Sequence, residues 1–390
     1  MRAGVAKGII TPPLPVQLAG YGIERVCTEV ADELAARVLV VEQDGRRVAL
    51  LSAELLWLER RNVRVIRDHV ARLCGLAPDD LMVSVIHTHA GPDTIDWYDF
   101  APVDPTWLAT LLRQLAGLVW LACERLRPVR AELTFGHLPI GINRRQFGPN
   151  GCFIGEDPER PYDERATGLR LLDESGALYA SVVCGAAHPV SLGSAEAVIS
   201  GDWPGLMCRM VESTLGGTCL FVNGACGDVN PQMWGVRGYQ TMQLIGRRAG
   251  GAAIELLSQA TARTAEGVGA RRHEFAVAHH DHPYLAIPLA RRLAEDGQVI
   301  TEVQALRLGP LHLISQPGEC LTETGWRIQR ETKLPDAVIA GYTNDYLGYL
   351  PLPHIYEEGG YEPGATMLPA ESVLAVVAAA VEVGDALAAT

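Results

Sequence analysis

One stretch of the chain reads Ser84-Val85-Ile86-His87-Thr88-His89-Ala90-Gly91-Pro92 and joins the end of a buried strand to a pair of histidines. The apolar run over residues 81–86 is typical of a strand inside a sheet. Because side chains alternate along an extended backbone, the i, i+2 spacing puts His87 and His89 on the same side. Gly91 and Pro92 end the strand and leave room in front of both rings. Two imidazoles at the mouth of a strand are suitable ligands for a catalytic metal, most often zinc.

The composition limits the classes of protein to which the chain can belong. It has 390 residues, of which 48% are hydrophobic, enough for a sizeable core. Acidic residues outnumber basic ones by 46 to 33, for a net charge of −13. The densest basic run, 60–67, alternates with apolar residues as on the solvent face of a helix. Because a nucleic-acid-binding protein usually carries a basic patch, we expect no nucleic-acid partner.

Cysteine usage and the N-terminal residues favour a cytoplasmic protein. The nine cysteines are scattered without a CxxC pair, which is typical of reduced thiols in a reducing compartment. Residues 1–12 lack the apolar stretch of a signal peptide. The longest apolar candidate, 107–123, contains Arg113 and Gln114 and is interpreted as an amphipathic or buried helix. We therefore expect no stable insertion into a membrane.

Strand and helix patterns alternate along the whole chain. Two hairpins are indicated, around Asp44-Gly45 and around 173–176. Helices are predicted at 62–76, 105–126, 203–215, 240–262, 320–332 and 371–387, and further strands at 130–135, 218–222, 273–278, 299–308 and 311–315. Hairpins mixed with crossover helices imply an α/β (α+β) fold, with mixed β-sheets flanked by helices. We expect residues 1–390 to form a single domain, with loop insertions at 144–167 and 279–288.

Four further segments place polar or small residues directly after a buried strand. These segments lie at 182–189, 220–231, 313–319 and 338–346, and they carry His188, Asp228, Glu319 and Tyr346. Strand ends at one edge of a sheet are where α/β enzymes assemble their sites. Five such endings with histidines, carboxylates and a tyrosine indicate one shared functional site.

Short motifs extend this pattern almost from end to end of the chain. They are 4–12, Gly20-Tyr21-Gly22, His87-Thr88-His89-Ala90-Gly91-Pro92, Gly141-Ile142-Asn143-Arg144-Arg145, Ala187-His188-Pro189, 200–205, Gly227-Asp228-Val229-Asn230-Pro231, Pro317-Gly318-Glu319, Asn344-Asp345-Tyr346 and Gly360-Tyr361-Glu362. Each motif is short, but their joint order is specific. The set resembles the neutral (non-lysosomal) ceramidase family, zinc-dependent amidases that cleave N-acyl bonds. The resemblance implies a ceramidase-like catalytic domain.

The resemblance also implies a role for each matching residue. The zinc ligands would be His87, His188, Glu319 and Tyr346. The catalytic residues would be His89, Arg144, Asp228 and Tyr361. Zinc held in this way lowers the pKa of a bound water toward roughly 7 and so supplies a nucleophile for an amide carbonyl. His89, Arg144 and Tyr361 would face or stabilise the carbonyl oxygen, and either Glu319 or Asp228 would hold or move protons.

Three departures from the family pattern bear on the substrate. Asn230 stands where the family motif has serine, which excludes a serine nucleophile there and favours direct attack by metal-activated water. The chain stops where the family's catalytic domain stops, without the C-terminal immunoglobulin-like domain of secreted members, and it shows no signal peptide. We therefore predict a cytoplasmic zinc amidase for a small-molecule N-acyl substrate other than ceramide. The alternatives are an esterase, lactonase or lactam hydrolase with the same zinc site, and a non-catalytic ligand-binding relative. The sequence is compatible with a homo-oligomer.

Other polar positions have structural interpretations. Asp202 precedes a helix and is interpreted as its N-cap, ahead of a role as a partner of His188. Glu54 follows a buried strand and could approach the edge of the site. Cys226 is interpreted as a small buried residue, and the histidines within 279–282 as solvated groups on a surface loop.

Overall fold

The hairpin predicted around Asp44-Gly45 forms the middle of the first sheet. The computed structural model describes the chain except for residues 97–102, 234–235, 260–262, 266, 281–297 and 335. In it, β5 (Ala35–Gln43) pairs antiparallel with β6 (Arg46–Ala53). The sheet continues through β1 (Arg2–Ile9) and β8 (Arg127–Pro128) on one side and β7 (Leu81–Val85) on the other. β7 runs parallel to β6, and the connection between them contains helix α1 (Arg60–Cys74).

Two four-stranded sheets repeat this mixture of antiparallel and parallel pairing. One has the order β15 (Thr218–Asn223), β13 (Leu178–Gly185), β12 (Arg165–Leu172) and β9 (Arg130–His137). The other has the order β17 (Val268–Val277), β18 (Val299–Leu308), β19 (Leu311–Ser315) and β21 (Val338–Ala340). The parallel pairs are β13 with β15 and β19 with β21. The predicted mixed α/β architecture is confirmed.

One face of each sheet contributes to a common core, because the side chains alternate along each strand. On β5, Leu39 belongs to the same buried cluster as Leu169 of the second sheet and Leu306 of the third. The neighbouring Val38 and Val40 belong to the other cluster, which includes the helices. The three sheets therefore pack against one another on their inner faces and against helices on their outer faces.

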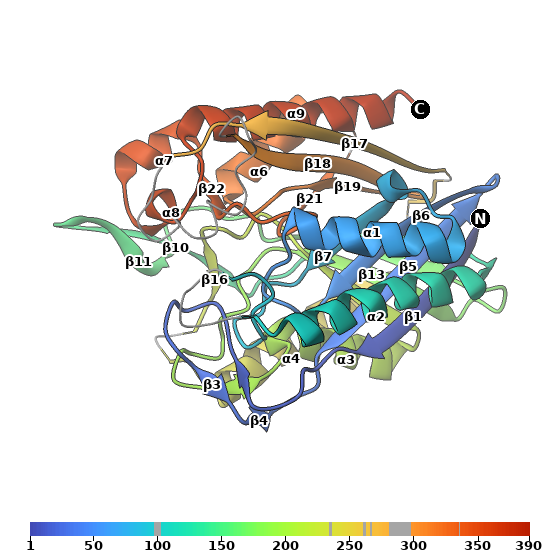
Figure 1. The fold of residues 1–390 in the computed structure, drawn as a ribbon, viewed down its shortest axis with the longest axis horizontal. Helices are drawn as coiled ribbons and strands as arrows, with labels where there is room; N and C mark the ends of the chain where they lie inside the picture. Colours follow the sequence, from blue (N-terminus) through green and yellow to red (C-terminus); the bar gives the residue numbers. More distant parts are fainter. Residues whose placement is uncertain (97–102, 234–235, 260–262, 266, 281–297, 335) are drawn as a thin grey trace.

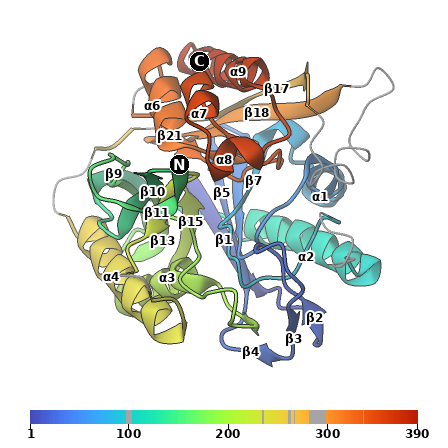
Figure 2. The ribbon, with the colours of Figure 1, turned by 90° about the vertical axis from the view of Figure 1, so that its left-hand side faces the viewer.

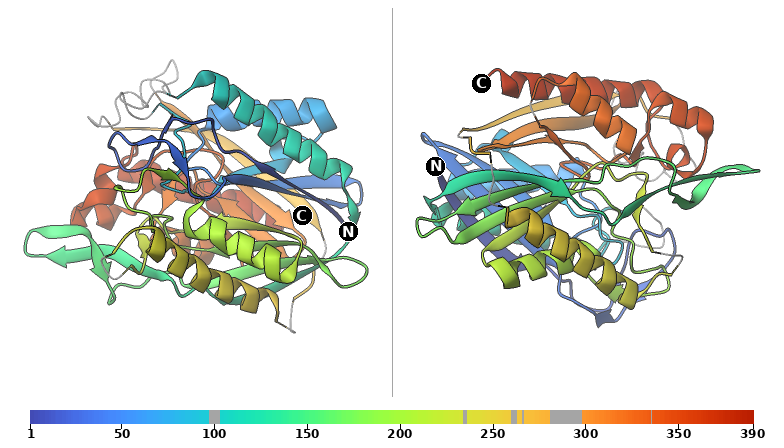
Figure 3. Two further views of the ribbon diagram at one scale, coloured as in Figure 1. Left: turned by 90° about the horizontal axis from the view of Figure 1, so that it is seen from below. Right: turned by 180° about the vertical axis from the view of Figure 1, so that it is seen from behind.

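The helices cover the outer faces of the three sheets (Figure 2). α2 (Pro105–Glu124) packs on β1 and β5 beside α1. α3 (Asp202–Leu215) and α4 (Tyr239–Leu257) cover the second sheet, and α6 (Thr322–Glu331) and α9 (Ala370–Ala388) cover the third. The right-hand view of Figure 3 shows α3 and α4 on one side of the sheets and α9 on the opposite side. Within the described residues, α2 alone is long and apolar enough to cross a membrane by length and composition; 44% of that stretch is buried.

The segment 144–167, predicted as a loop insertion, is mostly strand, so that prediction was wrong. β10 (Gly141–Gly148) and β11 (Gly151–Asp157) form a hairpin that extends from the body of the molecule (Figures 1 and 3), and β12 begins at Arg165. β10 also pairs with β16 (Val229–Pro231). The polar, glycine-rich composition hid a hairpin with many exposed side chains. Of the second predicted loop, 279–288, residues 281–288 lie outside the described residues.

The remaining elements are short and mostly lie around one end of the sheets. They are β2 (Val16–Gln17), β3 (Val26–Cys27), β4 (Glu29–Val30), η1 (Pro78–Asp80), β14 (Val198–Ile199), β20 (Glu319–Cys320), β22 (Tyr349–Leu350), α7 (Pro353–Glu358) and α8 (Tyr361–Gly364).

The C-terminal ends of four strands, β7, β13, β15 and β21, meet at one place, because hydrogen bonds join the segments that follow them. Ser84 of β7 forms an antiparallel bridge with Thr343, which follows β21. The side-chain nitrogen of Asn223, at the end of β15, donates to the carbonyl oxygens of Ile86 (3.1 Å) and Ala187 (3.3 Å). The segments after β7, β13, β15 and β21 are thus held side by side.

Candidate functional site

His87 lies two residues after the end of β7 and is held by both its backbone and its ring. Its φ of 71° lies in the left-handed region, which a non-glycine residue seldom adopts. Its backbone N–H donates to the carbonyl of Leu55 at 2.9 Å. Ring atom Nδ1 lies 2.8 Å from the carbonyl oxygen of Leu56. Because a carbonyl can only accept, Nδ1 carries the proton, and Nε2 presents a lone pair to the site.

His188 lies just past the end of β13 and is fixed in the same way. Its Nδ1 lies 2.6 Å from the carbonyl oxygen of Cys226. Its backbone N–H donates to Val229, and its carbonyl accepts from the indole of Trp203. Nε2 is therefore unprotonated and faces the same space as Nε2 of His87. Burial lowers the pKa of His188 to about 4, and the nearby Arg144 guanidinium adds to the effect.

Glu319, after β19, places a carboxylate between the two histidines. Its Oε2 lies 2.9 Å from Nε2 of His188 and 3.5 Å from Nε2 of His87. Burial alone would raise the pKa of Glu319, but the two imidazoles hold it well below its usual range. The hydroxyl of Tyr346 donates to the other oxygen, Oε1, at 2.5 Å. The other three sequence-predicted ligands, His87, His188 and Tyr346, therefore meet around the Glu319 carboxylate.

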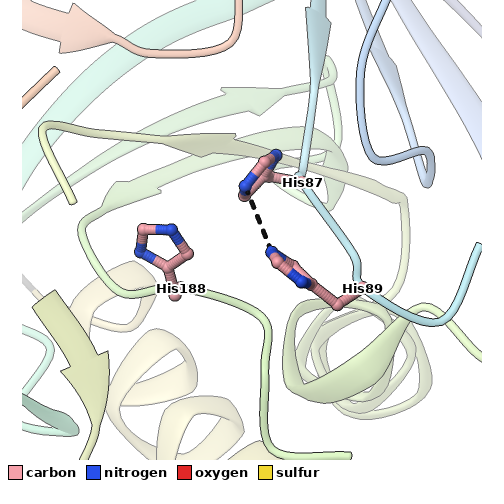
Figure 4. Close-up of side chains that lie close together, drawn as sticks. All are labelled: His87, His89 and His188. Carbon is pink, nitrogen blue, oxygen red and sulfur yellow. Dashed lines mark hydrogen bonds between the residues drawn. The ribbon is translucent and has the colours of Figure 1, made fainter. Parts of the chain in front are cut away.

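His89 completes the cluster from the same segment as His87 (Figure 4). Its Nε2 lies 3.3 Å from Nε2 of His87, and one ligand nitrogen from each of His87, His89 and His188 lies within 4.8 Å of the others. Nδ1 of His89 is buried and has no hydrogen-bond partner. A side chain at Gly20 (φ 109°) would lie 2.6 Å from that Nδ1, so glycine is what lets the loop approach. Burial and the neighbouring imidazoles lower the pKa of His89 well below its ordinary value.

Arg144 lies opposite the histidines, at a bulge in β10. The pairing of β10 with β11 shifts register between Asn143 and Arg145. Nη1 of Arg144 lies 3.3 Å from Nε2 of His188, and Nη2 donates to the hydroxyl of Tyr349 at 2.9 Å. Nε donates to Glu362 at 2.9 Å. Burial opposes the charge, but Tyr349 and Glu362 raise the pKa of Arg144 well above its usual value, so it stays a cation.

Tyr361 and Asp228 occupy different surroundings from the histidines. Tyr361 is 50% exposed, and its ring meets that of Tyr349 edge-on at 5.5 Å. Asp228 is buried, and both its oxygens are engaged: Oδ1 accepts from the backbone and hydroxyl of Thr322, and Oδ2 accepts from Asn143. Burial raises the pKa of Asp228 despite these bonds. Asp228 thus connects the start of α6 to the Arg144 bulge.

Two secondary interpretations from the sequence can also be checked. Asp202 is not the N-cap of α3: Gly201 takes that position, and Asp202 is the first helical residue, with a φ of 50°. Its carboxylate accepts from the backbone N–H groups of Leu192 and Trp203, which binds the preceding loop to the helix. Glu54, just after β6, forms an ion pair with Arg37 of β5 at 2.6 Å.

Several site residues had no functional role assigned from the sequence. Tyr342 stacks on His87, with ring centroids 3.9 Å apart, and its hydroxyl lies 3.4 Å from Oε2 of Glu319. Tyr349 and Glu362 fix Arg144, and Asn223 joins the two histidine-bearing segments. Glu362 belongs to the Gly360-Tyr361-Glu362 motif, so the sequence contained a signal that could have identified it as a site residue. The roles of Tyr342, Tyr349 and Asn223 depend on contacts across the fold.

The arrangement fits a bound cation. Nε2 of His87, Nε2 of His188 and Oε2 of Glu319 converge on one another, with 2.9 Å and 3.5 Å from the carboxylate oxygen to the two ring nitrogens. Two imidazoles and one carboxylate form the ligand set of many catalytic zinc sites. The carbonyls of Leu56 and Cys226 orient the rings as outer partners of metal-bound histidines do.

Comparisons with known proteins agree with this arrangement. No protein-family model matches the chain. It is 24% identical to neutral ceramidase of Mycobacterium tuberculosis, over 95% of this chain and 74% of that protein. It is 27% identical to neutral ceramidase 1 of Arabidopsis thaliana, over 52% of this chain and 28% of that protein. The match to neutral ceramidase of Drosophila melanogaster, at 24% identity, covers 60% of this chain and 36% of that protein.

Solved structures show the same fold. The crystal structure of neutral ceramidase from Pseudomonas aeruginosa matches with a TM-score of 0.84 at 20% identity, over 99% of this chain and 74% of that one. A ceramidase complexed with C2 matches with a TM-score of 0.85 at 18% identity, over 100% and 75%. The chain is a homologue of the neutral ceramidases and has their fold.

Proposed function

We propose that the chain is a zinc-dependent hydrolase of amide (N-acyl) bonds. The observation that carries the proposal is the convergence of three acceptors, Nε2 of His87, Nε2 of His188 and Oε2 of Glu319. Each of the three comes from a different sheet, and all are buried. The relationship to the neutral ceramidases supports the choice of an N-acyl amide as the bond that is cleaved.

His87, His188 and Glu319 would hold the zinc, with Tyr346 beside them. Zinc bound there would polarise a carbonyl group and activate a water molecule. His89 lies next to the metal ligands, and its ring is neutral. Its Nε2 is therefore suited to exchange a proton with the substrate.

Arg144 would stabilise the negative charge that develops on the carbonyl oxygen. It is a buried cation whose orientation is fixed by Glu362 and Tyr349 before any substrate arrives, which is the condition for efficient stabilisation. Oδ1 of Asn230 lies 3.4 Å from Nη1 of Arg144. Asn230 therefore helps to hold Arg144 in place. Its amide side chain does not provide the nucleophile that a serine would. Tyr361, half exposed beside Tyr349, would contact the substrate, and Asp228 would act by positioning Asn143.

We propose a small-molecule N-acyl amide other than ceramide as the substrate class, because ceramidases meet their lipid at membranes outside the cytoplasm, where we expect this chain not to act. All nine cysteines are free, which supports the proposal of a reducing, cytoplasmic location. An ester or lactone substrate remains the second candidate, because the same ligands and the same cation would serve that bond.

Metal analysis of the purified protein tests the first part of the proposal. We expect about one zinc per chain, lost in His87→Ala and in His188→Ala. His137→Ala, whose side chain is 65% exposed on β9, is the matched control and should keep its zinc. Protein without metal, or metal unaffected by both site variants, would contradict the proposal.

A substrate screen on the zinc-loaded protein tests the second part. We expect turnover of N-acyl amines, abolished in Arg144→Ala with zinc retained. Turnover of lactones or esters alone would replace the amidase proposal with the second candidate. Stoichiometric zinc with no turnover of any of these classes would support a non-catalytic relative.

A further inference from the structure

Two cysteines from different helices lie in contact at the end of β7 remote from the histidines. Cys74 is the last residue of α1, and Cys123 lies in the last turn of α2. Their Sγ atoms are 3.6 Å apart. Cys74 is half-buried, whereas Cys123 is 7% exposed. One residue of the pair is thus partly exposed, and the thiol of the other, buried residue is in contact with its sulfur.

A guanidinium group lies beside this pair. Nη2 of Arg47, at the start of β6, donates to the carbonyl oxygen of Cys74 at 2.8 Å. Burial and the neighbouring thiol raise the pKa of Cys123 to about 12, and Arg47 opposes this rise. A positive charge next to a partly exposed cysteine is the usual setting of a reactive thiol. The pair Cys208 and Cys219 differs, because both of those thiols are fully buried.

We propose that Cys74 and Cys123 form an oxidisable dithiol that reacts with a small-molecule disulfide such as oxidised glutathione. The Cys74 thiolate attacks one sulfur of the glutathione disulfide, which forms a mixed disulfide and releases one glutathione thiolate. The Cys123 thiolate then attacks the sulfur of Cys74, forming the Cys74–Cys123 bond and releasing the second glutathione. Two protein thiols are oxidised, one glutathione disulfide is reduced, and the two protons pass to the glutathione thiolates.

The bond would close a loop that carries the site histidines. Cys74 and Cys123 are 49 positions apart, and His87 and His89 lie between them. Because such a cross-link restricts the unfolded chain, the oxidised protein should be more stable. Cys74 contacts Arg47 at the start of β6, the end at which Ala49 of β6 pairs with Leu81 of the parallel β7, and β7 ends at Val85, two residues before His87. The dithiol therefore lies at the far end of the strand, and zinc content should not change.

Treatment of the purified full chain with oxidised glutathione tests this proposal. We expect the number of free thiols in the denatured protein to fall from nine to seven, with a mass loss of about 2 Da for the two hydrogens and a 74–123 cross-linked peptide in a non-reducing digest. The melting temperature should rise by several degrees. Cys208→Ser is the matched control: it should also lose two free thiols and form the 74–123 cross-link, with the same rise in melting temperature as wild type.

The single variants separate the proposed bond from other thiol chemistry. Cys74→Ser and Cys123→Ser should each fail to form the cross-link and to gain stability, while their reduced forms keep a wild-type zinc content. If either serine variant fails to fold, the corresponding alanine variant takes its place. A stable glutathione adduct on Cys74 without ring closure, or a cross-link that persists in Cys123→Ser, would overturn the proposal.

Discussion

Replacement of Glu362 by alanine should destabilise the protein more than replacement of any other residue that binds Arg144 or Arg145. The Glu362 carboxylate accepts from Nε of Arg144 and, at 2.5 Å, from Nη1 of Arg145. Both ion pairs have side chains that are 5% exposed or less. Removal of one partner of a buried pair costs about 3–5 kcal/mol, because the remaining charge stays buried. Arg144 keeps Tyr349, and Arg145 keeps Glu358, so we expect about 3–4 kcal/mol rather than twice the cost of a single pair.

Urea unfolding of the metal-free protein at pH 7 measures this cost. Glu358→Ala is the matched control: it also removes a carboxylate that contacts Arg145, but that side chain is 25% exposed. We expect Glu358→Ala to cost about 1 kcal/mol and Glu362→Gln, which keeps an acceptor, to lie between the two alanine variants. Equal costs for Glu362→Ala and Glu358→Ala would refute the reasoning that burial sets the magnitude.

The pH dependence supplies an independent check on Glu362. Burial would raise its pKa, but Arg144 and Arg145 hold that pKa below its usual value. Between the folded pKa and the unfolded value of about 4.3, the unfolded chain binds the proton and the folded protein does not. The contribution of Glu362 is thus present above pH 4.3 and lost as the pH falls through the folded pKa. Glu362→Gln should show a shallower acid limb; an unchanged limb would contradict this assignment.

Three further predictions concern the histidine cluster. His89→Ala should retain zinc but lose turnover by at least about 100-fold; loss of zinc would make His89 a ligand. The metal-free protein should lose on the order of 3 kcal/mol between pH 6.5 and pH 4, because His188, with a pKa of about 4, stays neutral while the unfolded chain takes up the proton; a flat profile in thermal unfolding would contradict this. Asn223→Ala should weaken zinc binding about 10-fold to 100-fold in a competition titration, because both histidine segments lose a donor; unchanged affinity would exclude this positioning role.

The candidate site was predictable where its residues directly follow buried strands. His87, His188 and Glu319 each come after a run of apolar residues, with glycine or proline within five positions, a pattern visible in the sequence alone. Parallel strands that end at the same edge then bring such residues together. The fold class was predictable for the same reason, since hairpins and crossover helices leave different patterns. The local sequence pattern could not predict which residue each side chain contacts.

The contacts that orient the site depend on residues far apart in the chain. Glu362 reaches Arg144 and Arg145 across more than 200 positions. The hairpin of β10 and β11 was predicted as a loop because polar residues and glycines mask its alternation, although its base carries Arg144. Asp202 shows that a local pattern can also mislead. Its position is typical of an N-cap, but its carboxylate accepts from the backbone N–H of Leu192 in the preceding loop.

Strained backbone at the site is supported by hydrogen bonds between the first and third sheets. His87, Tyr342 and Asn344 all have positive φ values, and such conformations cost roughly 1 kcal/mol or more each. Where β7 meets the segment after β21, Val85 donates to Tyr342, Asn344 donates to Val83, and the Asn344 side chain accepts from Val83. These bonds hold Tyr342 and Asn344 in their conformations, and His87 is held by the bond from its backbone N–H to Leu55. The fold thus places His87 against Tyr342, with ring centroids 3.9 Å apart, and 3.5 Å from the Glu319 carboxylate.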